Sequence, residues 1–280
     1  MAARKSLIIL IVIALFICYS ATSFGSGERE SNSNTSSLDV QKIEYTGITK
    51  VIIENDSIFN IKVTGTADES ALYGEIISEN LRMFDIENIR TGSELRIEIS
   101  QRMHLFRRSS EINDIILNVP INTELFLKSE TGLVLIENCN GYKELSTETG
   151  EICVVNSTGN IHADNETGDL TFGNIIGNIY ANSETGSILL YNVSGRLNLN
   201  TETGSLEGNL IELTDDSEFN TDTGIINFDL VNNLSDLSYD LDTDTGIIIL
   251  DTIQSSGEYY SDTGILKIHA ETDTGDIIFQ

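Results

Sequence analysis

The sequence predicts an all-β protein, namely a single-stranded parallel β-solenoid with 18-residue coils of two nine-residue sides, preceded by an N-terminal β capping region. The first observation is the tripeptide Glu-Thr-Gly, whose glycines recur at a constant interval, at Gly132, Gly150, Gly168, Gly186 and Gly204. The second is a glycine midway through each interval, at Gly141, Gly159, Gly177 and Gly195. The third is a composition rich in Ile, Leu, Asn, Thr and Gly with a single proline, which suits stacked strands joined by turns at fixed positions.

Residues 1–25 have the pattern of a signal peptide. A short basic start precedes an unbroken apolar run, 7–18. A bilayer-spanning helix needs about 20 such residues, so the run suits a signal-peptide core better than a membrane span. We therefore expect an exported protein of the periplasm, outer membrane or cell surface. A lipid anchor at Cys18 is an alternative that we do not favour, because the bulky Ile17 precedes it where a lipid-attachment signal takes a small residue.

Three further segments follow. Residues 26–40 are polar and rich in Ser and Asn, which predicts a flexible linker. Residues 41–128 are β-like without a repeat, and we expect them to cap the first coil, since the ends of a solenoid need a distinct cover. Residues 129–280 hold the solenoid repeats. The strands expected in the cap are Ile43–Tyr45, Lys50–Glu54, Ile58–Val63, Glu94–Ile99, Asp114–Val119 and Leu125–Lys128.

Each repeat places like residues at like positions, so side chains stack in columns about 4.8 Å apart. Apolar residues stand two and four positions after the main glycines and predict the core; Lys143 breaks the apolar pattern of the second side. An asparagine column, expected to pass amide hydrogen bonds between coils, comprises Asn138, Asn156, Asn174 and Asn192. A threonine ladder expected inside the glycine corner comprises Thr131, Thr149, Thr167, Thr185 and Thr203.

Two cysteines follow the signal segment. Cys139 lies seven positions after its repeat glycine and Cys153 lies three after its own. These phases differ by about 13 Å along a strand, which exceeds the Cα separation of a disulfide. We therefore expect two free thiols, with Cys139 buried.

The carboxylates before the Thr-Gly pairs form the candidate interaction or cation ridge. They are Glu130, Glu148, Glu166, Glu184, Glu202, Asp222, Asp244 and Asp262, with Asp273 in the same motif. Like charges about 5 Å apart repel, so such a column has to face solvent or bind cations. We favour a solvated ridge over calcium binding, because calcium needs about six to eight converging oxygens. No cofactor is expected.

Several enzyme and nucleic-acid classes are disfavoured. Sixteen Lys and Arg oppose 44 Asp and Glu, a net charge of −28, so nucleic acid is not an expected partner. Asp-Thr-Gly matches the string of aspartic proteases, but here it replaces Glu-Thr-Gly at the same corner, and that chemistry needs two loops facing each other. The basic segment Gln101–Arg108 is most simply a solvated loop. No Ser/His/Asp or Cys/His set can be assembled, so we expect no enzyme.

The repeats resemble a bacterial family of β-solenoids known as "putative adhesins", which includes head-GIN-domain proteins. The resemblance lies in the corners SETGSILL, NETGDLTF and TETGSLEG, in the lead-in IILNVPINTELFLKSETG, and in SELRIEIS. It covers nearly all of the chain after the signal segment. It implies an exported or membrane-tethered envelope protein, and the family supplies no known catalytic residues to carry over.

The leading hypothesis is a non-catalytic cell-envelope β-solenoid that serves as an adhesin or as a surface or periplasmic interaction module. Its partners would be envelope or surface components, either protein or glycan. One alternative is an accessory component of envelope-stress signalling, and another is a polysaccharide-active β-helix enzyme. Because no cap is evident after Gly275, we also expect the C-terminal edge, residues 276–279, either to self-associate with a neighbouring chain or to be shielded by a folded-back loop.

Overall fold

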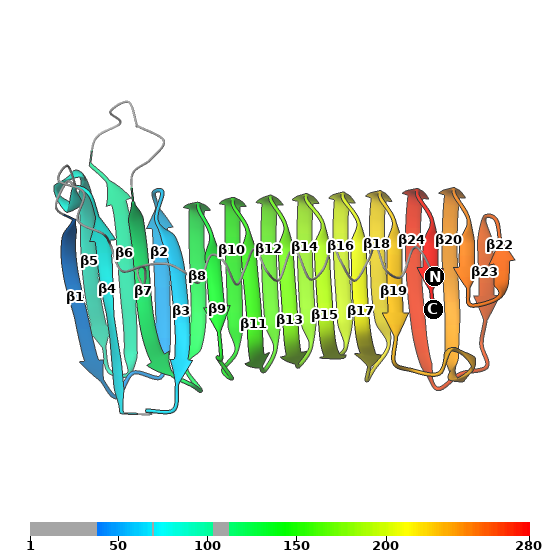
Figure 1. Cartoon of the computed structure of the whole chain (residues 1–280), viewed down its shortest axis with the longest axis horizontal. Coiled ribbons are helices and arrows are strands. Elements are labelled where there is room, and N and C mark those ends of the chain that lie inside the picture. Colours follow the sequence, from blue (N-terminus) through cyan, green and yellow to red (C-terminus); the bar gives the residue numbers. More distant parts are fainter. Residues whose placement is uncertain (1–37, 69, 103–111) are drawn as a thin grey trace, which may run out of the picture.

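The structure is a computed structural model that describes residues 38–68, 70–102 and 112–280. The expected signal peptide, Cys18, most of the linker and most of the basic segment Gln101–Arg108 lie outside the described residues. The described chain is all-β, with a 13-stranded sheet (sheet A) and a 12-stranded sheet (sheet B) that run along the whole length of an elongated molecule (Figure 1). Within these ranges no helix is long and apolar enough to cross a membrane.

The strands alternate between the two sheets along most of the chain. In spatial order, sheet A comprises β1 (Asp39–Thr46), β4 (Ala71–Ser78), β7 (Asn113–Pro120), β3 (Asn60–Thr66), β9 (Val134–Glu137), β11 (Ile152–Thr158), β13 (Leu170–Ile176), β15 (Ile188–Gly195), β17 (Leu206–Leu213), β19 (Ile226–Leu230), β25 (Ile277–Phe279), β21 (Ile248–Leu250) and β22 (Ile253–Ser255). Sheet B comprises β23 (Glu258–Ser261), β20 (Leu237–Thr245), β24 (Leu266–Thr274), β18 (Ser217–Thr223), β16 (Leu197–Thr203), β14 (Ile179–Thr185), β12 (Ile161–Thr167), β10 (Lys143–Thr149), β8 (Glu124–Thr131), β2 (Lys50–Asp56), β6 (Glu94–Gln101) and β5 (Phe84–Thr91).

The repeat period of the sequence sets the register of the parallel strands, because residues one repeat apart pair with each other. In sheet B, Lys143 pairs with Ile161 and Ile161 with Ile179. In sheet A, Ile152 pairs with Leu170 and Leu170 with Ile188. Each side chain therefore lies beside its equivalent in the next repeat, at the inter-strand spacing of about 4.8 Å.

The core lies between the two sheets and is built from the predicted apolar columns. Every member of those columns is buried except Leu266, which is half-buried. Leu266 differs because it starts a strand of sheet B beside Leu237 and does not follow a corner. Burying a side chain such as Leu or Ile stabilises a fold by about 1.5–3 kcal/mol, so the stacked columns supply the main stabilising contribution.

The main glycines form a column at which the backbone turns from sheet B to sheet A. At Gly186 a Cβ atom would overlap the carbonyl oxygen of Gly168, and φ is 150°. The backbone N–H of each glycine except Gly246, the last of the column, donates to a threonine carbonyl of the neighbouring strand, as Gly168 does to Thr185 at 2.9 Å. The column runs 132, 150, 168, 186, 204, 224, 275 and 246. Glycine recurs because the carbonyl of the preceding repeat occupies the place of a side chain.

The asparagine column marks a second special backbone position, within strands β11, β13 and β15 of sheet A and directly after β9. Asn138, Asn156, Asn174 and Asn192 all have positive φ, between 52° and 57°. As predicted, their amides bond across repeats: Nδ2 of Asn174 donates to Oδ1 of Asn156 at 2.8 Å, and Nδ2 of Asn192 to Oδ1 of Asn174 at 2.9 Å. Asparagine tolerates this left-handed conformation better than other non-glycine residues. In the next repeat the same position is Leu210, with φ 57°.

The N-terminal strands belong to the same two sheets as the repeats. Strands β2 and β3 are inserted in parallel between strands that come later in the sequence: β2 lies between β6 and β8, and β3 lies between β7 and β9. The covering role expected of the whole region falls to antiparallel strands, β1 and β4 on sheet A and β5 on sheet B. All six strands expected here are present, whereas β4 and β5 were not expected.

The C-terminal strands are also inserted. Strand β24 lies between β18 and β20, and β25 lies between β19 and β21, all parallel. The expectation of an open edge at residues 276–279 is therefore wrong, because β25 has a partner on each side. The end of the molecule is formed by the antiparallel strands β22 and β23.

One of the two cysteine predictions is confirmed. Cys139 is free and buried, so no disulfide joins it to Cys153. The expectation that Cys153 is a second free thiol is wrong, because Cys153 is disulfide-bonded.

Candidate functional site: a polar groove on sheet B

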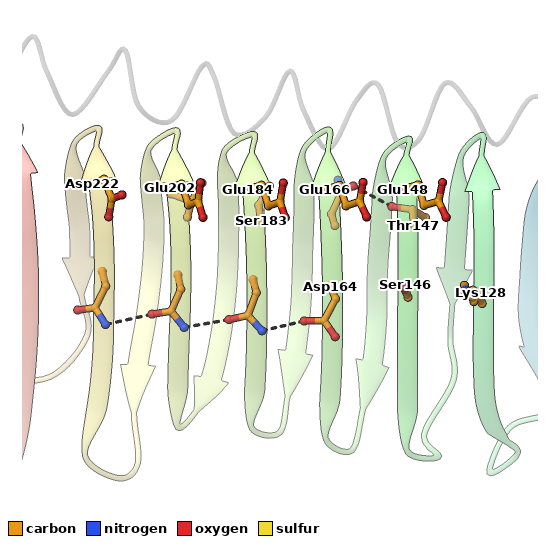
Figure 2. Close-up of a pocket in the computed structure, with 15 residues that line it drawn as sticks. Lys128, Ser146, Thr147, Glu148, Asp164, Glu166, Ser183, Glu184, Glu202 and Asp222 are labelled. Atoms are coloured by element: carbon orange, nitrogen blue, oxygen red, sulfur yellow. Dashed lines mark hydrogen bonds between the residues drawn. The ribbon is translucent and has the colours of Figure 1, made fainter.

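A groove of about 520 Å³ runs across the outer face of sheet B (Figure 2). Two rows of outward side chains define it, two positions apart on each strand from β10 to β18. The first row holds Ser146, Asp164, Asn182, Asn200 and Asn220, and the second holds Glu148, Glu166, Glu184, Glu202 and Asp222. Lys128 of β8 lies at one end. The groove therefore crosses the repeats, parallel to the long axis of the molecule.

The first row contains an amide ladder, which we define as Asp164, Asn182, Asn200 and Asn220. Nδ2 of Asn220 donates to Oδ1 of Asn200 at 3.0 Å, and Nδ2 of Asn200 donates to Oδ1 of Asn182 at 2.9 Å. Nδ2 of Asn182 then donates to Oδ1 of Asp164 at 2.7 Å, which ends the dashed line in Figure 2. All amides point the same way, so the ladder is a polarised chain that ends on a carboxylate.

The second row is the central part of the carboxylate ridge predicted from the sequence. Glu130, Glu148, Glu166, Glu184, Glu202, Asp222, Asp244 and Asp273 are all exposed, at the ends of strands in sheet B. Thr274 pairs with both Thr223 and Thr245, so Asp273 stands between Asp222 and Asp244. The ridge thus follows the order of the strands in the sheet and not their order in the sequence.

Asp262 does not belong to the ridge, and that assignment is corrected here. It lies in the connection between β23 and β24, outside the corner series. The following Gly264 packs against the backbone of Asp236 and Leu237, and its N–H donates to the hydroxyl of Ser238 at 2.9 Å. The tripeptide Asp-Thr-Gly is therefore used for two different backbone structures in this chain.

A buried column of small polar residues supports the ridge from inside. Thr201 donates its hydroxyl to the carbonyl of Gly186 at 2.9 Å, and Thr221 donates to Gly204 at 3.0 Å. In another repeat the amide of Asn165 reaches the carbonyls of both Gly150 and Gly168. The threonine ladder predicted inside the corner is therefore wrong by two positions, and its members are exposed: Thr131, Thr149, Thr167, Thr185 and Thr203. The alternation of inward and outward side chains along each strand stops at the ridge, so the threonine before the glycine also faces solvent.

Aromatic rings adjoin the amide ladder on the same outer face. His162 and Tyr180 stand two positions before Asp164 and Asn182, about 6.6 Å along their strands. Their rings are stacked, with centroids 6.4 Å apart and an interplanar angle of 27°. Nε2 of His162 lies 3.1 Å from Oδ2 of Asp164, which joins the aromatic row to the ladder.

Within the described residues no group of three or more His, Cys, Asp or Glu side chains could hold a metal ion. Two buried groups with shifted pKa values lie between β9 and the start of β10, outside the residues that line the groove. Burial raises the pKa of the Cys139 thiol to about 11, and burial lowers the pKa of the Lys143 amine to about 8. The groove is suited to forming hydrogen bonds along its length.

Sequence reasoning found the ridge and missed both the amide ladder and the aromatic row. The signal for the ladder was present, because Asp164, Asn182 and Asn200 follow one another at the repeat period. Each of them stands two positions before a ridge carboxylate on the same strand, so all of them lie on the same face of the sheet as the ridge. The aromatic row had only His162 and Tyr180 to mark it, which is too short a series to stand out.

The fold defines an elongated all-β repeat protein with two long, largely parallel sheets, and comparison with solved structures supports this. A structure from Bacteroides fragilis described as a putative adhesin is similar, with a TM-score of 0.57, 13% identity, and coverage of 88% of this chain and 98% of that one. A putative cell adhesion protein from Clostridium sporogenes aligns over 86% of this chain and 99% of that one at 11% identity, with a TM-score of only 0.27. The first likeness supports the fold alone, and the second carries no argument. No protein-family model and no curated protein matches the sequence.

Proposed function

We propose that this chain is a non-catalytic, exported surface protein whose groove on sheet B binds a partner of the cell envelope or of another surface. The observation that carries the proposal is the groove itself. Five consecutive strands present one row of a hydroxyl, a carboxylate and three amides and a second row of carboxylates at constant spacing, along one outer face. A surface of that kind is suited to binding an elongated partner along its length.

The architecture that supports the groove is, in this proposal, a β-solenoid in which each repeat is one coil with one strand in each sheet. The parallel registers and the glycine column at the corner favour it. A stack of this kind is stiff along its axis, because every repeat bonds to both neighbours through its backbone. A stiff rod holds the groove straight over the length of a partner.

An adhesin-like role agrees with the description of the similar solved structure as a putative adhesin. Export agrees with the apolar segment near the N-terminus, and the excess of 44 acidic over 16 basic residues suits a soluble rod exposed to solvent.

The test is capture of envelope material by the purified full chain, with and without the ridge. Glu166→Gln with Glu184→Gln removes two ridge carboxylates. The matched control, Glu151→Gln with Glu212→Gln, removes two exposed carboxylates that do not line the groove. We expect the first pair to lower capture and the second to leave it unchanged. Recovery of the native protein in the cytosolic fraction, or equal capture by both variants, would refute the proposal.

A further inference from the structure

The amide ladder has hydrogen-bonding capacity left over. A primary amide offers two N–H donors and two lone pairs. Asn182 uses one N–H, toward Asp164, and its oxygen accepts one bond, from Asn200. Asn200 also donates to Oδ1 of Asn198, and Asn220 also donates to Oε1 of Glu218. The spare N–H group of the ladder is therefore that of Asn182, while the ridge carboxylates supply acceptors. The groove therefore presents donors and acceptors together, and a partner that fits it has to supply both.

The ridge carboxylates recur on every strand along the groove. Neighbouring strands are about 4.8 Å apart, so an amide beside a carboxylate recurs at that interval across β14, β16 and β18, and β12 carries two carboxylates, Asp164 and Glu166. A partner that uses the whole groove has to be a linear polymer with a similar repeat. Pyranose rings in a linear β-1,4 glycan recur at nearly this interval, whereas alternate side chains of an extended peptide recur at about 6.8 Å.

The aromatic row adds an apolar contact that a purely cationic partner does not need. Tyr180 is 36% exposed, and its ring stacks on that of His162 beside the ladder. At the end of the same face, Phe126 and Tyr142 form a second ring pair with centroids 5.8 Å apart. Aromatic faces beside a few placed polar groups are a common arrangement in ligand sites. Sugar rings match it, because they carry C–H groups on their faces and hydroxyls at their edges.

The negative charge of the groove favours a neutral glycan over an anionic one. The ridge carboxylates accept hydrogen bonds from hydroxyl groups and repel anionic groups, and Lys128 is the one cation among the described residues that line the groove. A uronic-acid or sulfated polymer would place anions against Glu166, Glu184 and Glu202. A neutral polymer would meet hydrogen-bond acceptors without this repulsion.

We infer that the groove and its aromatic row bind a linear, neutral polysaccharide that lies along the long axis of the molecule. This rests on the proposed function, since it names the partner of the same surface. Sugar hydroxyls bond the amide ladder and the ridge, and the sugar rings pack against Tyr180 and His162.

The test is titration of the full chain with soluble oligosaccharides followed by calorimetry. Cellohexaose and chitohexaose are the neutral probes, hexagalacturonate is the anionic one and hexalysine the cationic one. We expect binding of a neutral hexasaccharide, weaker binding of its trisaccharide, and about tenfold weaker binding in Tyr180→Ala. Tyr191→Ala is the matched control, because Tyr191 is an outward tyrosine on the opposite sheet. Tyr180→Phe keeps the ring and should bind as the native chain does. The double variant Asn182→Ala with Asn200→Ala should also weaken binding, with its fold checked by circular dichroism.

Three outcomes overturn the inference. Binding of hexalysine without binding of any neutral glycan would assign a cationic partner to the groove and leave the proposed function intact. Glycan binding that is equal in Tyr180→Ala and Tyr191→Ala would place the sugar elsewhere on the molecule. No binding of any probe, together with envelope capture that ignores the ridge substitutions, would remove both the inference and the proposed function.

Discussion

Lys143 is a charged residue at a position where its neighbours in the column are apolar. It pairs with Leu125 on one side and Ile161 on the other, and its side chain is fully buried. Its Nζ donates to the carbonyl oxygens of Gly141 and Thr158, both at 2.8 Å. Burial lowers the pKa of the amine from 10.5 to about 8. We predict that this lysine makes the stability of the protein depend on alkaline pH.

The sign follows from the proton balance. Between pH 8 and pH 10.5 the unfolded chain holds a proton on this lysine that the folded chain has lost, so stability rises with pH in that window. One pKa unit corresponds to about 1.36 kcal/mol, and the shift of about 2.5 units corresponds to about 3 kcal/mol. Below pH 8 the folded protein carries the whole of this cost.

The measurement is urea unfolding of the native chain and of Lys143→Met at pH 7.5, 9 and 10.5. Methionine keeps most of the length of the side chain and removes the charge, although it leaves two carbonyls without their lysine donor. That loss is independent of pH, so the diagnostic quantity is the change with pH in the difference between the two proteins. We expect this difference to shift by about 3 kcal/mol in favour of the native chain as pH rises.

Tyrosine ionisation affects both proteins equally and cancels in that difference. Lys128→Met serves as the control, because Lys128 is an exposed lysine on the neighbouring strand β8. Its difference from the native chain should stay flat. A difference for Lys143→Met that is constant with pH would show that the buried amine titrates as it does in water, and the reasoning would fail.

Three further predictions concern the backbone. Leu210→Asn should stabilise the protein by about 1 kcal/mol, because it relieves a left-handed leucine and extends the bonds of Asn192, whereas Leu210→Ala should not; thermal unfolding decides. Gly186→Ala should destabilise by about 3 kcal/mol or more through overlap with the preceding carbonyl, while Gly92→Ala, which has open space, should cost only about 1 kcal/mol in urea titrations. A chain that stops at residue 264 lacks β24 and β25, so proteolysis should cut β20–β23 rapidly and spare β10–β16; equal protection of both regions would contradict the observed strand order.

The regular part of this fold could be predicted from sequence because one spacing determines both the register and the direction of each side chain. The evenly spaced glycines from Gly132 to Gly204 predicted the corner, and period-two alternation between them predicted the core. The strand order at the two ends could not be predicted, because it depends on which strands pair and not on local pattern. The longer interval before Gly224 and the uneven intervals after it indicate irregularity without saying that β24 moves inward.

The site shows the same division. The ridge could be predicted because its members share a tripeptide. The same tripeptide led to the wrong assignment of Asp262, because Asp262-Thr263-Gly264 has this sequence in a different backbone conformation. The amide ladder mixes Asp and Asn, so it is recognised only once the strands are aligned. Its hydrogen bonds, all pointing one way, come from side-chain geometry that no residue spacing specifies.

The insertion of late strands between earlier ones has a consequence for how the molecule is made. Residues 237–261 are synthesised before residues 266–279, yet in the sheets they reach the body of the protein only through β24 and β25. Strands β2 and β3 likewise emerge early and gain their partners only when β6 to β9 exist. The repeats between them can assemble one after another as the chain emerges. The two ends of the molecule, in contrast, can be completed only after later residues have been synthesised. A chain interrupted during synthesis or export therefore keeps an exposed sheet edge, which distinguishes it from a complete chain.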